Sequence, residues 1–120
     1  EWHGLYTGEV FHDPSELDID HLVPLKEAHQ SGAADWPGQR KHRYANDLRH
    51  PETLIAVEKG ANRSKGADDP AEWMPPEESA HCVYLKRWIQ VKREWGLEMD
   101  SGERQVVNSK LQECAGVERR

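Results

Sequence analysis

The stretch Leu17-Asp18-Ile19-Asp20-His21-Leu22-Val23-Pro24 decides the fold. Apolar and polar residues alternate at its start, which is typical of a half-buried strand. Proline has no backbone N–H to donate, so the strand is expected to end near Pro24. A second run, Thr53-Leu54-Ile55-Ala56-Val57, is rich in β-branched and apolar residues and is the other good strand candidate. Two short strands, far apart in the sequence, are therefore predicted.

Short helices are expected around these strands. Lys26–Gln30 should form one that Ser31-Gly32 stops. Pro37 can begin another at its first position, running through Arg40–Asp47. Gly60–Gly66 predicts a turn that leads into a helix or helical turn. Nearer the start, Tyr6–Phe11 has strand-like residues and ends at a turn signal.

The last third of the chain predicts two helices. Glu77–Trp95 has helical periodicity, and Gly96 is a natural stop. Ser101 can cap a second helix that ends near Cys114 and Gly116. Because the joint between them is tight, the two helices should form an antiparallel hairpin over about residues 77–115.

The two cysteines, Cys82 and Cys114, lie at equal sequence distances from the joint of this hairpin. Such positions share the same height in an antiparallel pair, so the two sulfurs could meet. A disulfide there would contribute about 3–4 kcal/mol. The alternative is a pair of small buried residues in a reduced protein. We expect a cytoplasmic location unless the disulfide forms, in which case secretion fits.

The composition fits a folded domain that carries its charge unevenly. The chain has 120 residues and a net charge of −6, and its length suits one domain over residues 1–120. The apolar runs are too short to cross a membrane. Residues 1–39 hold one Lys and eight acids, whereas residues 40–65 hold seven Lys or Arg and three acids. This basic stretch is either a surface for nucleic acid or a solvated face of mixed charge.

Three polar residues offer the groups that phosphodiester hydrolysis needs. A water must be deprotonated, and a histidine such as His21 suits that step near neutral pH. A hard divalent ion, held by oxygen ligands, can stabilise the developing charge. Asp20 offers a carboxylate beside the histidine, and Asn62 offers an amide oxygen.

These residues lie in a set of motifs that resembles the HNH, or ββα-metal, endonucleases, and in particular one bacterial subfamily. The resemblance covers about residues 5–114. Its two main motifs are Asp20-His21-Leu22-Val23-Pro24-Leu25 and Asn62-Arg63-Ser64-Lys65-Gly66. The others are Tyr6-Thr7-Gly8, Lys26-Glu27-Ala28-His29, Ser31-Gly32-Ala33, Trp36, Tyr44-Ala45-Asn46-Asp47 and Asp69-Pro70-Ala71-Glu72-Trp73-Met74-Pro75.

The resemblance implies a fold and a set of roles. The fold is α+β, with a ββα core over about residues 17–66, a two-stranded antiparallel hairpin and a helix, covered by further helices. His21 matches the general base, and Asp20 and Asn62 match the protein ligands of one divalent ion: Mg, Mn or another first-row transition ion. Thr53 stands nine residues before Asn62, where the family usually has an Asn that holds the catalytic loop. Thr53 can still form hydrogen bonds there, and Asn46 is an alternative for that role.

The remaining site residues are less constrained by the sequence. Asp18 lies two residues before Asp20, so it is either a further acidic neighbour of the ion or solvent-facing. Arg63 and Lys65 flank the metal position and are expected either to bind phosphate or to be exposed cations at a turn. The other expected nucleic-acid contacts are Arg40, Lys41 and Arg43.

The implied activity is metal-dependent hydrolysis of DNA, with RNA as a possible substrate and little sequence preference. We expect a monomer with no membrane contact. Two other classes stay open. One is a non-catalytic nucleic-acid-binding module on the same scaffold, which the Thr53 departure favours. The other is a structural metal-binding domain, which should unfold when its ion is removed.

Overall fold

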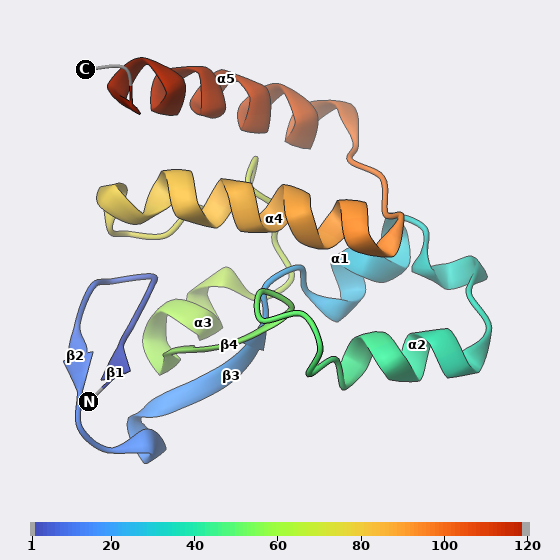
Figure 1. Ribbon diagram of the computed structural model, residues 1–120, viewed down its shortest axis with the longest axis horizontal. Coiled ribbons are helices and arrows are strands. Elements are labelled where there is room, and N and C mark those ends of the chain that lie inside the picture. Colours follow the sequence, from blue (N-terminus) through green and yellow to red (C-terminus); the bar gives the residue numbers. More distant parts are fainter. Residues whose placement is uncertain (1, 119–120) are drawn as a thin grey trace.

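The computed structural model describes residues 2–118, and it has the mixed α+β architecture that the sequence predicts. Two small antiparallel hairpins lie at one side of the molecule, and the helices cover them (Figure 1). Within the described residues, no helix is both long enough and apolar enough to cross a membrane.

The central hairpin pairs β3 (Leu17–His21) with β4 (Leu54–Glu58) in antiparallel register. Asp20 stands opposite Ile55, and His21 stands opposite Leu54. Both predicted strands form, and the second is shifted by one residue from the predicted Thr53–Val57. The first strand ends two residues earlier than Val23, because Leu22 and Val23 turn into the core, where both are fully buried.

Helix α3 (Lys59–Lys65) follows β4 directly and packs against both strands of the hairpin (Figure 1). Gly66 ends the helix with φ +55, a left-handed conformation that glycine adopts without steric cost. Strand, strand and helix therefore form the compact ββα arrangement that the sequence leads us to expect.

A second hairpin, β1 (Trp2–His3) with β2 (Val10–Phe11), lies beside the central hairpin (Figure 1). Only the end of the predicted strand at residues 6–11 is extended. Tyr6 lies instead in the turn and is fully buried. The Glu58 carboxylate explains this, because it accepts hydrogen bonds from the backbone amides of Tyr6 and Thr7 and so draws the turn inward.

Shorter helical elements connect these parts. They are η1 (Pro14–Glu16), α1 (Leu25–Gln30), η2 (Ala33–Asp35), α2 (Gly38–Ala45) and η3 (Glu78–Ala80). Helix α2 ends two residues before the predicted Asp47, whose side chain caps the following loop instead of continuing the helix.

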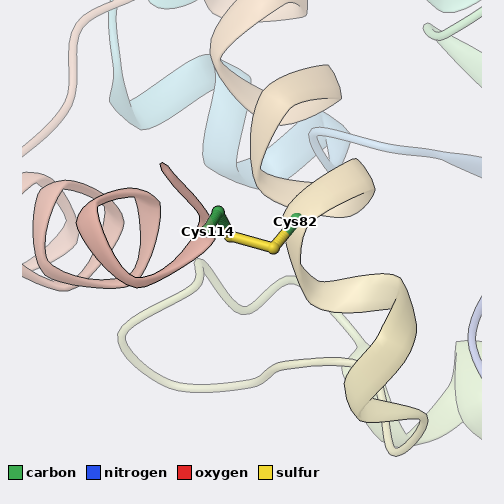
Figure 2. Close-up of a disulfide and its surroundings, with 2 residues drawn as sticks. All are labelled: Cys82 and Cys114. Carbon is green, nitrogen blue, oxygen red and sulfur yellow. A yellow bond between two sulfur atoms is a disulfide. The ribbon is translucent and has the colours of Figure 1, made fainter. Parts of the chain in front are cut away.

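The long helices α4 (His81–Trp95) and α5 (Ser101–Glu118) run antiparallel and side by side (Figure 1). Gly96 ends α4 with φ +66, the left-handed cap that the sequence predicts. A disulfide joins Cys82 to Cys114 across the pair, with Cα atoms 5.8 Å apart (Figure 2). It closes a loop of 32 residues and fixes the two helices in register.

One aromatic core connects the ββα unit to α2 and α4. Tyr6, Tyr44, Tyr84 and Trp88 are fully or almost fully buried, and Trp95 is 7% exposed. Several of the rings meet edge to face, as Tyr6 and Tyr84 do at 5.6 Å between centroids. The tryptophans of α4 are therefore core residues.

Candidate functional site

His21 is the last residue of β3, and its ring is held in place on one side. Its Nε2 lies 2.9 Å from the Ala45 carbonyl oxygen, and its ring stacks on Tyr44 at 5.9 Å. A carbonyl can only accept a hydrogen bond, so Nε2 must carry the proton in the neutral ring. The other nitrogen, Nδ1, then has the free lone pair that a general base needs.

The Ala45 carbonyl is well placed to orient this base. Ala45 is the last residue of α2, and the final carbonyls of a helix lack partners within the helix and carry its partial negative charge. The end of α2 is also fixed, because the Tyr44 hydroxyl donates to the Val23 carbonyl at 2.6 Å. Helix α2 therefore holds His21 at a defined angle.

Asp47 fixes the loop that leads from α2 to β4. Its buried carboxylate accepts from the backbone N–H groups of Arg49 and His50 and from the His50 ring. Burial opposes the charge of Asp47, but these hydrogen bonds prevail and leave its pKa below the ordinary value. No role was expected for Asp47, although it lies in the Tyr44–Asp47 motif.

Thr53 ends this loop, next to the hairpin. It is fully buried, and its backbone carbonyl accepts from the Leu22 amide at 3.0 Å. Its side chain contributes to the low pKa of Asp47, although Oγ1 does not meet ordinary hydrogen-bond geometry. Asn46 is exposed, and its side-chain amide donates back to the His42 carbonyl. Thr53 is thus buried beside this loop without a side-chain hydrogen bond to it, so its loop-fixing role stays a prediction, whereas the Asn46 side chain binds within the end of α2.

Asp20 points away from His21, to the other face of β3. Its Oδ2 accepts from the Lys65 ammonium at 2.6 Å and from the Tyr6 hydroxyl at 2.6 Å. Burial, with the nearby Asp20 charge adding to it, raises the pKa of Tyr6 far above its ordinary value, so the hydroxyl remains a donor. Neither partner was expected, although Tyr6 and Lys65 both belong to the motifs of the resemblance.

The expectation that Lys65 binds phosphate is corrected by this arrangement. Lys65 is fully buried, and its Nζ also lies 3.0 Å and 2.8 Å from the carbonyl oxygens of His21 and Leu22. Burial lowers its pKa, although the attraction of Asp20 opposes the shift. An ammonium whose protons are all used inside the protein cannot reach a phosphate at the surface.

Asn62 meets Asp18, not Asp20. Its Nδ2 donates to Asp18 Oδ2 at 3.1 Å, and the exposed Arg63 reaches the same oxygen at 4.0 Å. Asn62 and Lys65 are three residues apart on α3 and therefore face the same way. Asp18 and Asp20 likewise share one face of β3. The two contacts are successive steps of one interface between strand and helix.

The predicted residues thus form two adjoining groups. Asp18, Asp20 and Asn62 lie on the α3 side of β3, and His21 lies at its end, against α2. Among residues 2–118, no hydrogen bond joins His21 to any of the other three. The expected base and the expected metal ligands therefore have no direct side-chain contact with one another.

The predicted basic residues lie on α2, at the side of the site. Lys41 and Arg43 are exposed. Arg40 is partly buried: its guanidinium lies over the rings of Trp36 and Trp95 and donates to the Trp95 carbonyl at 2.8 Å. Arg40 is therefore fixed in position before any partner arrives.

A second acidic group lies between α1 and the helical hairpin, formed by Glu27, Asp69, Asp100 and Glu103, whose oxygens all lie within 4.8 Å of one another. The Lys92 ammonium already occupies it, at 2.7 Å from Glu27 and 2.6 Å from Glu103. This group therefore has one internal cation, which is paired with two of its four carboxylates.

Comparisons with known proteins place the chain in a family. Residues 3–105 match the family described as GmrSD restriction endonucleases, C-terminal domain. The chain is also 41% identical, over 113 residues, to an uncharacterized secreted protein of the fungus Arthroderma benhamiae. That match covers 94% of the chain but 55% of the relative, so the chain spans little more than half the length of that protein. No solved structure matches the chain.

These matches broaden what the motifs imply. The resemblance points to a bacterial subfamily, whereas the relative is fungal, so the sequence pattern is not confined to bacteria. The description of the family is that of a nuclease-related family. With its ββα unit and the match over most of its length, the chain belongs to the family of GmrSD restriction endonuclease C-terminal domains.

Proposed function

We propose that this domain is a metal-dependent endonuclease of the HNH type that hydrolyses phosphodiester bonds of DNA. The observation that carries the proposal is the position of His21. It stands at the end of a strand, with Nε2 bound to the Ala45 carbonyl and Nδ1 left as the basic atom. This is the arrangement expected of a histidine that takes a proton from water.

His21 Nδ1 accepts the proton of the attacking water in the proposed reaction. As the ring becomes positively charged, the hydrogen bond from Nε2 to the Ala45 carbonyl strengthens. The partial negative charge at the end of α2 stabilises the imidazolium in the same way. The stacking on Tyr44 keeps the ring from rotating away while it holds the proton.

The polar residues between β3 and α3 fit a hard divalent cation. Asp18, Asp20 and Asn62 offer only oxygen ligands, the type that Mg²⁺ and Mn²⁺ prefer. The sequence resemblance assigns Asp20, whereas the structure has Asp18 against Asn62, so both carboxylates belong to the proposed ligand set. When bound, the ion would stabilise the negative charge that develops on the phosphate and on the leaving oxygen.

The two carboxylates differ in one respect that bears on their roles. The Asp20 carboxylate faces an ammonium at 2.6 Å, which partly offsets its charge, and its side chain is 9% exposed. The Asp18 side chain is 27% exposed and lies farther from any cation. A divalent ion beside Asp18 and Asn62 would therefore meet less repulsion than one beside Asp20 alone.

A secreted enzyme is the favoured setting. The relative in Arthroderma benhamiae is described as secreted. The Cys82–Cys114 disulfide is the kind of bond that persists in oxidising compartments. Both support an extracellular nuclease, in contrast to the cytoplasmic location expected of a reduced chain.

Plasmid cleavage tests the proposal. The purified protein should convert supercoiled plasmid to open and linear forms with Mg²⁺ or Mn²⁺, and not in EDTA. His21→Ala should lose activity by a factor on the order of 10²–10⁴, the contribution of a general base. His12→Ala, which changes an exposed histidine outside the site, is the matched control. A protein that binds DNA but leaves it intact with every metal would be a binding module instead.

The ligand set is tested separately by titrating Mn²⁺ into the parent and into Asp18→Asn, Asp20→Asn and Asn62→Ala. Asn62→Ala should weaken Mn²⁺ binding whichever of the two aspartates is the other ligand. If only Asp20→Asn weakens it further, the sequence assignment holds; if only Asp18→Asn does, the contact with Asn62 identifies the ligand. Equal affinity in all four proteins would contradict a metal centre between β3 and α3.

A further inference from the structure

A pocket of about 530 Å³ lies beside α2, between its outer face, the 46–50 loop and the end of α4. Three arginines line it: Arg40, Arg43 and Arg49, together with His42 and His50. Asn46 also lines the pocket, and it is the residue directly after Ala45, whose carbonyl binds His21. The pocket therefore begins one residue from the group that orients the proposed base.

Cationic side chains outnumber acidic ones in this pocket, with three arginines against Asp47 and Glu94. Asp47 also lines it, but its carboxylate is used by the loop backbone and the His50 ring. Glu94 lies 3.9 Å from the other nitrogen of His50. Within the described residues, Arg43 and Arg49 form no ion pair, and both are exposed. The pocket is thus positive in a chain whose net charge is −6.

The pocket is also partly preorganised. The Arg40 guanidinium lies over the Trp36 and Trp95 rings and donates to the Trp95 carbonyl. Leu48 stands at the rim with 90% of its surface exposed, next to Arg49. A guanidinium held by contacts within the protein, two exposed ones and an apolar rim suit a ligand that is part anion and part sugar or base.

We infer that this pocket binds a phosphodiester group of the substrate strand, beside the bond that is cut. The inference rests on the proposed function and adds Arg49 and His50 to the DNA contact. Its role is to set the position of the backbone over His21. Because it recognises phosphate and not a base edge, it adds affinity and register without sequence preference.

The test measures binding without catalysis. A fluorescein-labelled 16-base-pair duplex is titrated with the full chain in EDTA at several salt concentrations. Arg43→Ala/Arg49→Ala should weaken binding on the order of tenfold and lower the slope of log K against log salt by about 1.8, for two lost phosphate contacts. Arg93→Ala/Arg104→Ala is the matched control, since these two exposed arginines line a different groove. It should bind like the parent.

Two further arms identify the anion. Duplexes with 5′-hydroxyl and 5′-phosphate ends should bind equally, and inorganic phosphate should compete only weakly. Binding that requires the 5′-phosphate would instead identify a terminal-phosphate site and overturn the inference. An equal loss of slope in both double variants would also overturn it. A parent that binds as described but never cleaves plasmid would refute the proposed function while the pocket stands.

Discussion

Lys65 and Lys92 are both buried ammonium groups, but they contact different kinds of partner. Lys65 meets one carboxylate, Asp20, and the carbonyl oxygens at the end of β3. Lys92 meets two carboxylates, Glu27 and Glu103, and the Glu98 carbonyl. The first lysine lies inside the ββα unit, and the second connects α1 to the helical hairpin.

This difference distinguishes residues that position the proposed catalytic base from residues that stabilise the packing of the helices. A lysine that binds the carbonyls of His21 and Leu22 sets where β3 ends and so where the base stands. Lys92 pairs with two of the four acids around it and so offsets part of their charge. Each buried charge costs solvation that only good partners offset, so removing either lysine leaves a carboxylate unpaired.

Replacing each lysine with methionine should show most clearly that the two lysines have different roles. Both Lys65→Met and Lys92→Met should lower the free energy of unfolding by about 3–5 kcal/mol, because a buried carboxylate loses its partner. Only Lys65→Met should also lower kcat of the folded enzyme, by a factor on the order of 10², because the base is displaced. Urea unfolding and initial cleavage rates below the transition measure the two effects. Equal kcat losses in both variants would contradict the division.

Removal of the disulfide should have the next largest effect, and it should change stability but not activity. Cys82→Ala/Cys114→Ala should lose about 3–4 kcal/mol of stability, because the unfolded chain regains the freedom of a 32-residue loop. The rate of cleavage at temperatures where the variant is folded should not change. A thermal melt with and without reductant checks the parent, and the double variant should show no response to reductant.

Tyr6→Phe measures how much the hydrogen bond from Tyr6 to Asp20 stabilises the ββα unit. The hydroxyl donates to Asp20 within the core, so its loss should cost about 1.5–3 kcal/mol, the range for a hydrogen bond to a charged group. Tyr84→Phe is the control, because the buried Tyr84 hydroxyl has no hydrogen-bond partner in the described part of the chain. It should be close to neutral. Similar losses in both variants would show that ring packing, not the Asp20 contact, is responsible.

The smallest effect concerns Asp69 and pH. Burial, and then the charges of Glu103 and Asp100, raise its pKa from 3.8 to about 6. Between these values the folded protein keeps a proton that the unfolded chain releases, so stability falls as pH rises through this window. Asp69→Asn removes this dependence and should be more stable than the parent at pH 7, with a difference that disappears near pH 4. A flat difference across this range would refute the raised pKa.

The fold follows from local patterns, which is why sequence reasoning predicts it well. Alternation predicts the strand at 17–21, a run of apolar and β-branched residues predicts the strand at 54–58, and Gly96 predicts the end of α4. The equal spacing of the cysteines about the joint is enough to suggest their contact. Tyr6–Phe11 fails as a strand because the carboxylate that draws Tyr6 inward, Glu58, is 52 residues away.

The site is harder to predict, because its contacts join residues that lie far apart in the sequence, as the contact between Tyr6 and Glu58 does. Lys65 looks like an exposed cation in a turn, because its partners Asp20 and Tyr6 lie 45 and 59 residues earlier. The orientation of His21 depends on a backbone carbonyl, which every residue has, so no residue type reveals it. Tertiary hydrogen bonds, not local propensity, decide both.

The most direct measurement of the central claim is rescue of a His21→Gly variant by free imidazole in the plasmid assay with Mn²⁺. If His21 is the base, the variant should be almost inactive. Imidazole should restore part of the cleavage rate, and the rescued rate should rise with pH as the neutral form of imidazole does. His12→Gly should be fully active and indifferent to imidazole. Cleavage by His21→Gly at the parental rate, or a variant that imidazole leaves inactive while it still folds and binds DNA, would contradict His21 as the base.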